Sequence, residues 1–399
     1  MKSYLLGYFL IYAIALSAFA AQDAPHVKDG QSDARQAIKD EEQPNDLQFR
    51  QSLEKQAAEG DSFAMYRLGT LYSGGVGVPK DMQLAFRWFT KAAEAGNTFA
   101  MESLGMFYAE GLGVPQDYQR AKSWAEKAAA KGSTNSMFNL AVLYDNGKGV
   151  KQDYGVARQW YKKAAALGHA NAMFNLGVHY EHGDGMPQDD RIARRWFEKA
   201  AEAGNTGAMV NLGRLYELGK GGPQDYHLAL EWYEKAAASG SPEAMTNIGL
   251  FYINGQGTAQ DYQLARSWFE RAAGAGGGIA MFQLGVLYTR GRGVSKSFRL
   301  AREWYEKAAN LGISGAMTNL GFIYVNGDED VPKDLPLAFK CFLKDADAGN
   351  AQAMFSVALF YELGQGGLER NYRLARQWYE KALAAGDSRA HERLSRLPQ

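Results

Sequence analysis

Few residues in this sequence combine a type and a spacing that could do chemistry. Ser52 and Lys55 form a Ser-x-x-Lys pair, one of the three motifs that serine penicillin-recognising enzymes combine. Cys341, the one cysteine of the chain, is a candidate nucleophile. His179 and His182 lie three residues apart, which places both imidazoles on one helical face, where they are weak candidate ligands of a zinc ion.

None of these residues is accompanied by the further motifs or ligands that catalysis requires. The Ser-Asp-Asn and Lys-Thr-Gly motifs are absent, and counting back 36 residues from Trp88 and Lys91 assigns the serine and lysine to a repeated pattern. The two histidines have only Glu181 beside them, so we interpret them as tolerated substitutions. Nucleophile elbows, zinc-protease motifs and phosphate loops are also absent. We therefore predict no catalytic residue, no cofactor and no metal.

A repeat organises the chain. An Ala-Met or Ser-Met pair returns every 36 residues, and once after 37, in nine copies that begin at Ala64, Ala100, Ser136, Ala172, Ala208, Ala244, Ala280, Ala316 and Ala353. All eight tryptophans fall in one slot of the repeat, and Cys341 occupies that slot in the eighth copy. We therefore interpret the tryptophans as core residues and the cysteine as their buried substitute.

Each copy predicts two helices. In the second copy, Ala100, Leu104 and Tyr108 recur at helical spacing and indicate a first helix of about three turns. Gly111 follows where glycine commonly ends a helix. Asp117 then stands at the N-cap of a second helix, rich in alanine, that contains the tryptophan. The fold class is therefore all-α, and nine tandem helix pairs predict an α-solenoid with atypical ends.

Two copies depart from the pattern. Ser297 replaces the capping aspartate in the seventh copy and is a weaker cap. The eighth copy has an insertion around Asp328, Glu329 and Asp330, and Asp345 where alanine is usual. The turn there is longer and more acidic, which indicates either a local bend or a contact site.

The repeated pattern resembles the Sel-one-like repeat, a relative of the tetratricopeptide repeat. The third copy contains the signature in Leu140, Tyr144, Gly147, Gly149, Val150, Asp153, Ala157, Trp160, Lys163, Ala164, Ala165 and Gly168. The resemblance implies a right-handed superhelix of antiparallel helix pairs, whose first helices line a concave surface. It also implies an adaptor or assembly scaffold, often in the bacterial envelope or at host contact. Some cysteine-rich relatives are described as β-lactamase-like, but their paired cysteines are absent here.

One position has no evident packing role. The residues directly before the stripe leucine, which we call the amide row, are Arg67, Ser103, Asn139, Asn175, Asn211, Asn247, Gln283, Asn319 and Ser356. Asparagine is a mediocre helix former, and its amide can both donate to and accept from a peptide backbone. The resemblance adds that related repeats hold peptides with a matching asparagine. Alternatively, each amide bonds the neighbouring copy. Our candidate partner-binding residues are Asn139, Asn175, Asn211, Asn247, Asn319, Arg67 and Arg214.

The N-terminus has the pattern of an export signal. Lys2 precedes an uncharged stretch, and Ala18-Phe19-Ala20 matches a cleavage site, although an uncleaved anchor is the alternative. We expect a periplasmic or secreted protein, or one of the endoplasmic reticulum lumen if the source is eukaryotic; the C-terminus lacks a retention signal. The expected segments are a signal peptide (1–20), a flexible linker (21–46), a half-repeat cap (47–63), nine repeats (64–389) and a partial repeat (390–399).

Charge restricts the class of partner. The chain has 44 basic and 44 acidic residues, dispersed along its length, so no basic face is offered to nucleic acid. We predict a non-catalytic scaffold that binds a protein or an extended peptide on the concave surface. We expect a monomer or weak oligomer without a membrane span once the signal is removed. An envelope enzyme, β-lactamase-like or acting on peptidoglycan, and a secreted effector that engages a host protein remain alternatives.

Overall fold

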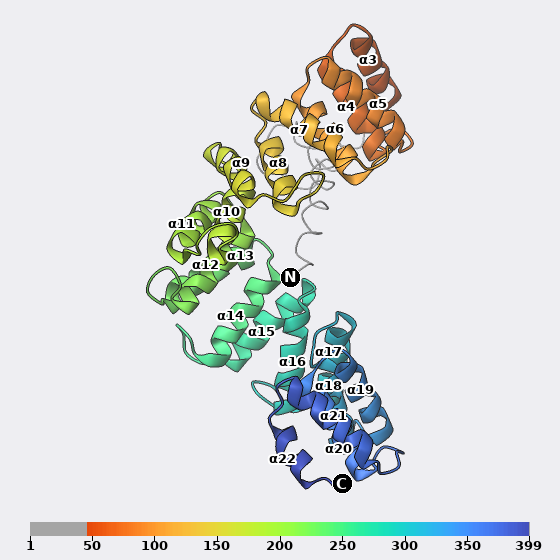
Figure 1. The fold of residues 1–399 in the computed structure, drawn as a ribbon, viewed down its shortest axis with the longest axis vertical. Helices are drawn as coiled ribbons and strands as arrows, with labels where there is room; N and C mark the ends of the chain where they lie inside the picture. The colour runs from red at the N-terminus through yellow and green to blue at the C-terminus, as the bar shows by residue number, and fades with distance from the viewer. Residues whose placement is uncertain (1–45, 399) are drawn as a thin grey trace, which may run out of the picture. The chain divides into compact units, whose positions relative to one another are not determined.

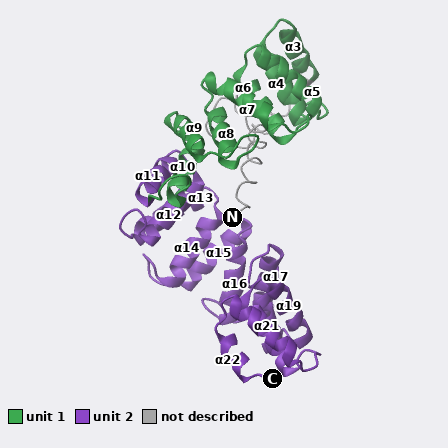
Figure 2. Cartoon of the chain, viewed as in Figure 1, with its two compact units in different colours: residues 1–189 green, residues 190–399 purple. Residues whose placement is uncertain are grey.

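The computed structural model describes residues 46–398, which form twenty α-helices and no strand (Figure 1). The all-α prediction is confirmed. The expected signal peptide and nearly all of the expected linker lie outside these residues. The chain divides into two compact units, Met1–Asp189 and Asp190–Gln399, and each is described by itself (Figure 2).

Unit 1 contains the first three copies and the first helix of the fourth. Its helices are α3 (Asp46–Ala58), α4 (Ser62–Gly74), α5 (Met82–Glu94), α6 (Thr98–Glu110), α7 (Tyr118–Ala130), α8 (Thr134–Asn146), α9 (Tyr154–Ala166) and α10 (Ala170–His182). Consecutive helices pack side by side. α3 lies 36 residues before α5 and has its length, so it is the second helix of an incomplete leading copy.

Unit 2 contains the rest of the fourth copy, the last five copies and a terminal helix. Its helices are α11 (Asp190–Glu202), α12 (Thr206–Leu218), α13 (Tyr226–Ala238), α14 (Pro242–Asn254), α15 (Tyr262–Gly274), α16 (Gly278–Arg290), α17 (Phe298–Asn310), α18 (Ala316–Asn326), α19 (Leu335–Asp347), α20 (Ala351–Leu363), α21 (Tyr372–Ala384) and α22 (Arg389–Arg396). The solenoid prediction is confirmed by this regular pairing of helices.

Capping residues set the helix bounds. Asn97 accepts a hydrogen bond from Ala100 N at the start of α6, and Gly111 ends that helix with a φ of 71°. Asp117 caps α7 by accepting from Arg120 N at 3.0 Å. Ser297 caps α17 by accepting from Leu300 N at 3.3 Å. The predicted caps are therefore confirmed, including the serine.

The prediction of a tryptophan core is wrong in detail. The tryptophans are only partly buried, whereas the residue that follows each one is buried, as Phe197, Tyr233 and Phe269 are at 0% exposure. A lysine or arginine lies 4.0 to 4.8 Å over every indole, from the position three residues later. Each indole therefore lies at the edge of the core, with one side packed against the protein and a solvated cation over its ring.

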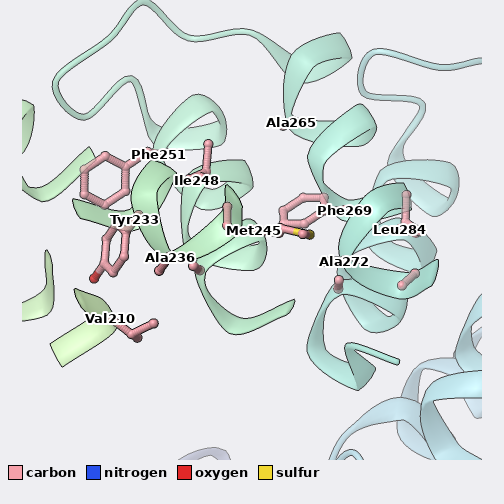
Figure 3. Packing of buried hydrophobic residues seen from close by; sticks show 14 of the residues in the cluster. Val210, Tyr233, Ala236, Met245, Ile248, Phe251, Ala265, Phe269, Ala272 and Leu284 are labelled. Carbon is pink, nitrogen blue, oxygen red and sulfur yellow. The ribbon is translucent and has the colours of Figure 1, made fainter. Parts of the chain in front are cut away.

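Close approach of the paired helices builds the core. Gly249 on α14 faces the ring of Phe269 on α15, and a Cβ atom at this glycine would lie 2.5 Å from the ring. Glycine is required here because it removes the atom that would hold the helices apart. Figure 3 shows the resulting cluster around Phe251, Phe269 and Leu284.

The eighth copy is altered at two places. α18 begins late, because Gly315 has a φ of 85° and provides no side-chain cap. The carboxylate of Asp345 instead accepts hydrogen bonds from Thr318 N at 2.8 Å and Thr318 Oγ1 at 2.6 Å. The inserted segment forms a local turn, because the side chain of Asp328 accepts hydrogen bonds from the backbone N–H groups of Asp330 and Val331.

No helix within residues 46–398 is long and apolar enough to cross a membrane.

Candidate functional site

The amide row lies on the first helix of each copy, directly before a buried aliphatic residue. Its members differ in what they contact. Ser103 and Ser356 are buried and donate to the carbonyls of Phe99 and Gln352, one turn earlier on their own helices. The partly buried members whose side-chain amides have no hydrogen-bond partner among the described residues are Asn139, Asn211, Asn247, Gln283 and Asn319.

Asn175 is the exception, because its amide is part of a polar cluster. Its Nδ2 donates to Tyr161 Oη at 2.9 Å, and Tyr161 Oη donates to Asp145 Oδ2 at 3.0 Å. His179 Nε2 lies 3.0 Å from Asp145 Oδ1. Burial and the charge of Asp145 raise the pKa of Tyr161 well above its ordinary value, so this phenol keeps its proton.

The two histidines of the metal hypothesis lie in different environments. His179 is only 3% exposed, and its ring contacts the edges of Tyr154 and Tyr161. His182 is exposed, and its Nδ1 lies 2.9 Å from the carbonyl of Val178. The part of the chain that the structure describes holds no group of three or more histidine, cysteine, aspartate or glutamate residues placed to bind a metal ion.

The tyrosine-carboxylate pair recurs. Tyr233 donates to Glu217 at 2.8 Å in the fifth copy, and Tyr379 donates to Glu362 at 2.5 Å in the ninth. In the ninth copy the other carboxylate oxygen of Glu362 lies 3.3 Å from Arg393 of α22. In the third copy the other oxygen of Asp145 contacts His179 of α10 in the same way. Asp145 and Glu362 therefore each join the two helices of their copy to a third helix.

We did not anticipate these pairs from the sequence, although it contains a signal for them. In three copies, the tryptophan is followed by a tyrosine and the tyrosine of the first helix is followed by an acidic residue, which is Asp145, Glu217 or Glu362. The slot after the tryptophan holds phenylalanine where the residue after the first-helix tyrosine is Ile253 or Val325, and also in the first and fourth copies, where that residue is Ser73 or Glu181. Each of these phenols thus occurs with an acceptor, because a buried hydroxyl without a partner is costly. The reverse does not hold, since the fourth copy combines the carboxylate Glu181 with Phe197.

The two arginines among our candidates lie on first helices. The guanidinium of Arg67 on α4 lies 5.6 Å over the ring of Phe49 on α3, a contact that helps to hold the leading half-copy. Arg214 lies on α12, three residues after Asn211, and is partly buried. Arg67 is thus itself a member of the amide row, and Arg214 lies one turn after its member Asn211.

The candidate nucleophiles have no activating partner in their contacts. Ser52 is exposed on α3, and its hydroxyl accepts from Gln56 at 3.4 Å, whereas Lys55 is exposed in the last turn. Cys341 is buried at 3% exposure, as expected. Burial and the charge of Asp345 raise the pKa of its thiol to about 11, so the unreactive thiol form dominates at neutral pH.

The repeat itself now identifies the family. The model of the Sel1 repeat matches nine segments, at residues 62–97, 98–133, 134–169, 170–205, 206–241, 242–277, 278–313, 314–350 and 351–387. The chain belongs to the Sel1 repeat family. The Sel-one-like resemblance is therefore confirmed. Proteins of this family are generally non-catalytic scaffolds for protein interactions.

Two solved Sel1-type structures resemble the chain. One is a protective antigen present in uropathogenic Escherichia coli strains, which displays an SLR fold; it has 33% identity and a TM-score of 0.65, over 86% of this chain and 81% of that chain. The other is a Sel1 repeat protein from Oxalobacter formigenes, with 31% identity and a TM-score of 0.57, over 62% of this chain and 99% of that chain. No curated protein sequence matches the chain.

Proposed function

We propose that this Sel1 repeat protein is a non-catalytic scaffold that binds an extended segment of a protein partner along its amide row. The proposal rests on the side-chain amides of Asn211, Asn247 and Asn319. These amides recur on the first helices of unit 2, are partly buried, and have no hydrogen-bond partner among the described residues. None of these amides contributes a fully buried polar atom without a partner in residues 46–398, so they are open to solvent. A recurring row of accessible amides favours a ligand that pairs with both groups of each amide.

The neighbouring side chains indicate the character of the bound segment. One turn after the row, the first helices of unit 2 carry Leu250, Val286 and Phe322, which are all partly buried, whereas Arg214 follows Asn211. An extended peptide offers backbone groups to the amides while its own side chains alternate. We therefore expect a partner segment that is apolar where it meets Leu250, Val286 and Phe322 and that places a polar or acidic group at Arg214.

The decisive experiment compares two triple variants of the full chain. Asn211→Ala, Asn247→Ala and Asn319→Ala remove the amides of the row, whereas Asn254→Ala, Asn310→Ala and Asn326→Ala remove three exposed asparagines of the same unit. Each protein is crosslinked in the producing organism and its bound protein is quantified by mass spectrometry. We expect the row variant to capture at least about tenfold less partner, at about 1 kcal/mol for each hydrogen bond lost.

The control triple should capture as much partner as the wild type, and both triples should melt near the wild-type temperature. Equal capture by the row variant and the wild type would sink the proposal. So would a large drop in the melting temperature of the row variant with intact binding, because the amides would then bond neighbouring copies.

We further propose that the scaffold is exported. The charge-free stretch and the Ala18-Phe19-Ala20 pattern support this, and the similar Escherichia coli protein is a protective antigen. Fractionation of the producing cells, followed by N-terminal sequencing, should find a mature chain that begins near Ala21 outside the cytoplasm. An intact N-terminus in the cytoplasmic fraction would contradict export without bearing on the amide row.

A further inference from the structure

A cavity in unit 1 lies away from the amide-row side chains, at the loop between α6 and α7. It has a volume of about 280 Å³. Its walls are the rings of Phe86 and Tyr108, which meet edge to face with centroids 5.5 Å apart. Val114, Pro115 and Gln116 line it from the loop. Asp117 and Arg120 complete the lining at the start of α7, where they form an ion pair of 3.3 Å.

The cavity coincides with a departure from the repeat. The position of Arg120 is apolar in every other copy, where it holds Leu84, Val156, Ile192, Leu228, Leu264, Leu300, Leu337 and Leu374. In the eighth copy, Leu337 packs in the same core cluster as Tyr324, the counterpart of Tyr108. The side chain of Arg120 is instead 66% exposed. The second copy therefore has a charged side chain at a position where the eighth copy has a leucine in the cluster of its tyrosine.

A second exchange accompanies the first. The position of Phe86 is a lysine or arginine in most other copies. In two of them that cation lies over the tyrosine of the next copy, as Lys122 does over Tyr144 at 5.9 Å and Arg194 over Tyr216 at 3.6 Å. At Tyr108 the cation is Arg120, 5.5 Å from the ring centroid. Arg120 therefore replaces the missing cation at Tyr108, which explains the cation–ring contact. It does not explain the cavity beside the tyrosine ring.

The groups around the cavity are held in place. Gln116 donates to the carbonyl of Ala109 at 2.7 Å and to Tyr118 Oη at 2.9 Å, which fixes the loop. Arg120 uses Nε toward Asp117 at 3.3 Å and Nη1 toward Tyr108 Oη at 3.4 Å. Its Nη2 has no hydrogen-bond partner among residues 46–398. A guanidinium with a free edge above aromatic walls suits a carboxylate attached to an apolar group.

We propose that this cavity, lined by Phe86, Tyr108, Val114, Pro115 and Arg120, binds an apolar side chain that carries a neighbouring carboxylate. The volume is below the lower end, about 300 Å³, of pockets for drug-sized ligands, so it admits one side chain rather than a larger molecule. Such a group occurs at the C-terminal residue of a peptide and in a free N-acylated amino acid. The site is independent of the amide row.

The test uses N-acetyl-phenylalanine and its amide as probes of the full chain, with binding followed by ligand-observed NMR and titration calorimetry. We expect the acid to bind about tenfold more tightly than the amide, because only the acid forms a charge-assisted bond to Arg120. Arg120→Leu, the residue of other copies, should fill the space and abolish binding of both probes. Arg120→Gln should leave the space open and remove the preference for the acid.

Arg373→Leu, which removes an exposed arginine of unit 2, is the matched control and should bind as the wild type does. The Arg120→Leu variant should remain folded, since most other copies have leucine at this position. A peptide that ends in phenylalanine distinguishes the two sources: tighter binding than the acetylated residue assigns the cavity to a chain terminus, and equal binding assigns it to a free acid. No binding of either probe at millimolar concentration, or unchanged binding to Arg120→Leu, would overturn the proposal.

Discussion

Single polar side chains among the alanines of the core distinguish copies that are otherwise alike. Asp145, Glu217 and Glu362 each accept from a buried tyrosine, and Asp345 accepts from Thr318 of the preceding helix. These groups could not be predicted from the repeat alone. The consensus defines what the copies share, whereas each of these contacts depends on two departures that occur together at distant positions.

Asp345 offers a direct stability test. In Asp345→Ala the amide and hydroxyl of Thr318 lose their acceptor, and α18 has no side-chain cap to replace it. Because unsatisfied buried donors are costly, we expect a loss of about 1–3 kcal/mol in the free energy of unfolding. Chemical denaturation measures it, with the exposed neighbour Asp347→Ala as control. Equal stability of the two variants would contradict this role.

His169 provides a pH-dependent contribution. Its Nδ1 accepts from Ala172 N at 3.2 Å and caps α10, while its ring stacks on Phe138 with centroids 4.7 Å apart. Only the neutral ring accepts, and burial lowers the pKa of His169 below its ordinary value. The folded chain therefore binds this proton less tightly than the unfolded chain. The stabilisation is present above about pH 6.5 and is lost as the pH falls through the lowered pKa.

We expect the wild type to lose more thermal stability than His169→Asn between about pH 7.5 and pH 5, since asparagine caps a helix at either pH. Melting temperatures at each pH measure the difference. His227→Asn, at an exposed histidine of unit 2, should follow the wild type. Parallel curves for the wild type and His169→Asn would rule out the cap as the titrating element.

At the scale of the helices, the sequence predicted the elements well and their packing less well. The stripe residues, the glycine stops and the aspartate caps were recognisable because each depends on a few adjacent residues. The tryptophan slot was misassigned, because helical spacing shows that a residue faces the neighbouring helix but not how deeply it is buried. The distinction requires the position of the partner helix, where Gly249 admits Phe269 and leaves the indole at the edge.

Two glycines of one helix pair should respond in opposite directions. In Gly249→Ala the new Cβ would lie 2.5 Å from the Phe269 ring, so α14 and α15 must separate, at a cost of about 1–3 kcal/mol. Gly274 lies in the last turn of α15 with no atom within 4 Å of an added Cβ. Gly274→Ala should stabilise by about 0.5–1 kcal/mol. Urea unfolding of both variants tests the pair, and losses of similar size would refute the close-approach argument.

At the scale of the whole molecule, stability in a repeat protein is the sum of contributions from copies and their neighbours. The fold class and the number of copies followed from the sequence because nine repetitions average out local ambiguity. The candidate site followed only in part. Periodicity located the amide row, but the sequence did not show that Asn175 is already engaged by Tyr161 while Asn211 and Asn247 are not.

The terminal helix α22 should protect only its neighbours. It buries Ala390 and Leu397 against Tyr379, and Arg393 reaches Glu362. In a chain ending at Gly386, hydrogen exchange should accelerate in α20 and α21, because their apolar face loses its cover, and should stay unchanged in α12 and α13. Exchange mass spectrometry reads both regions in one experiment. Uniform acceleration across unit 2 would show that the copies unfold together.

The tyrosine-carboxylate pairs also bear on how such a chain gains or loses length. Tandem copies of equal size are prone to unequal recombination, and a crossover at the boundary between copies keeps Glu217 with Tyr233. A crossover between the two helices of a copy would join the second helix that contains Tyr233 to the first helix of another copy, for example the one with Ile253, and leave a buried phenol without its acceptor. The heritable module is therefore the complete helix pair, and each buried pair selects against crossovers inside it.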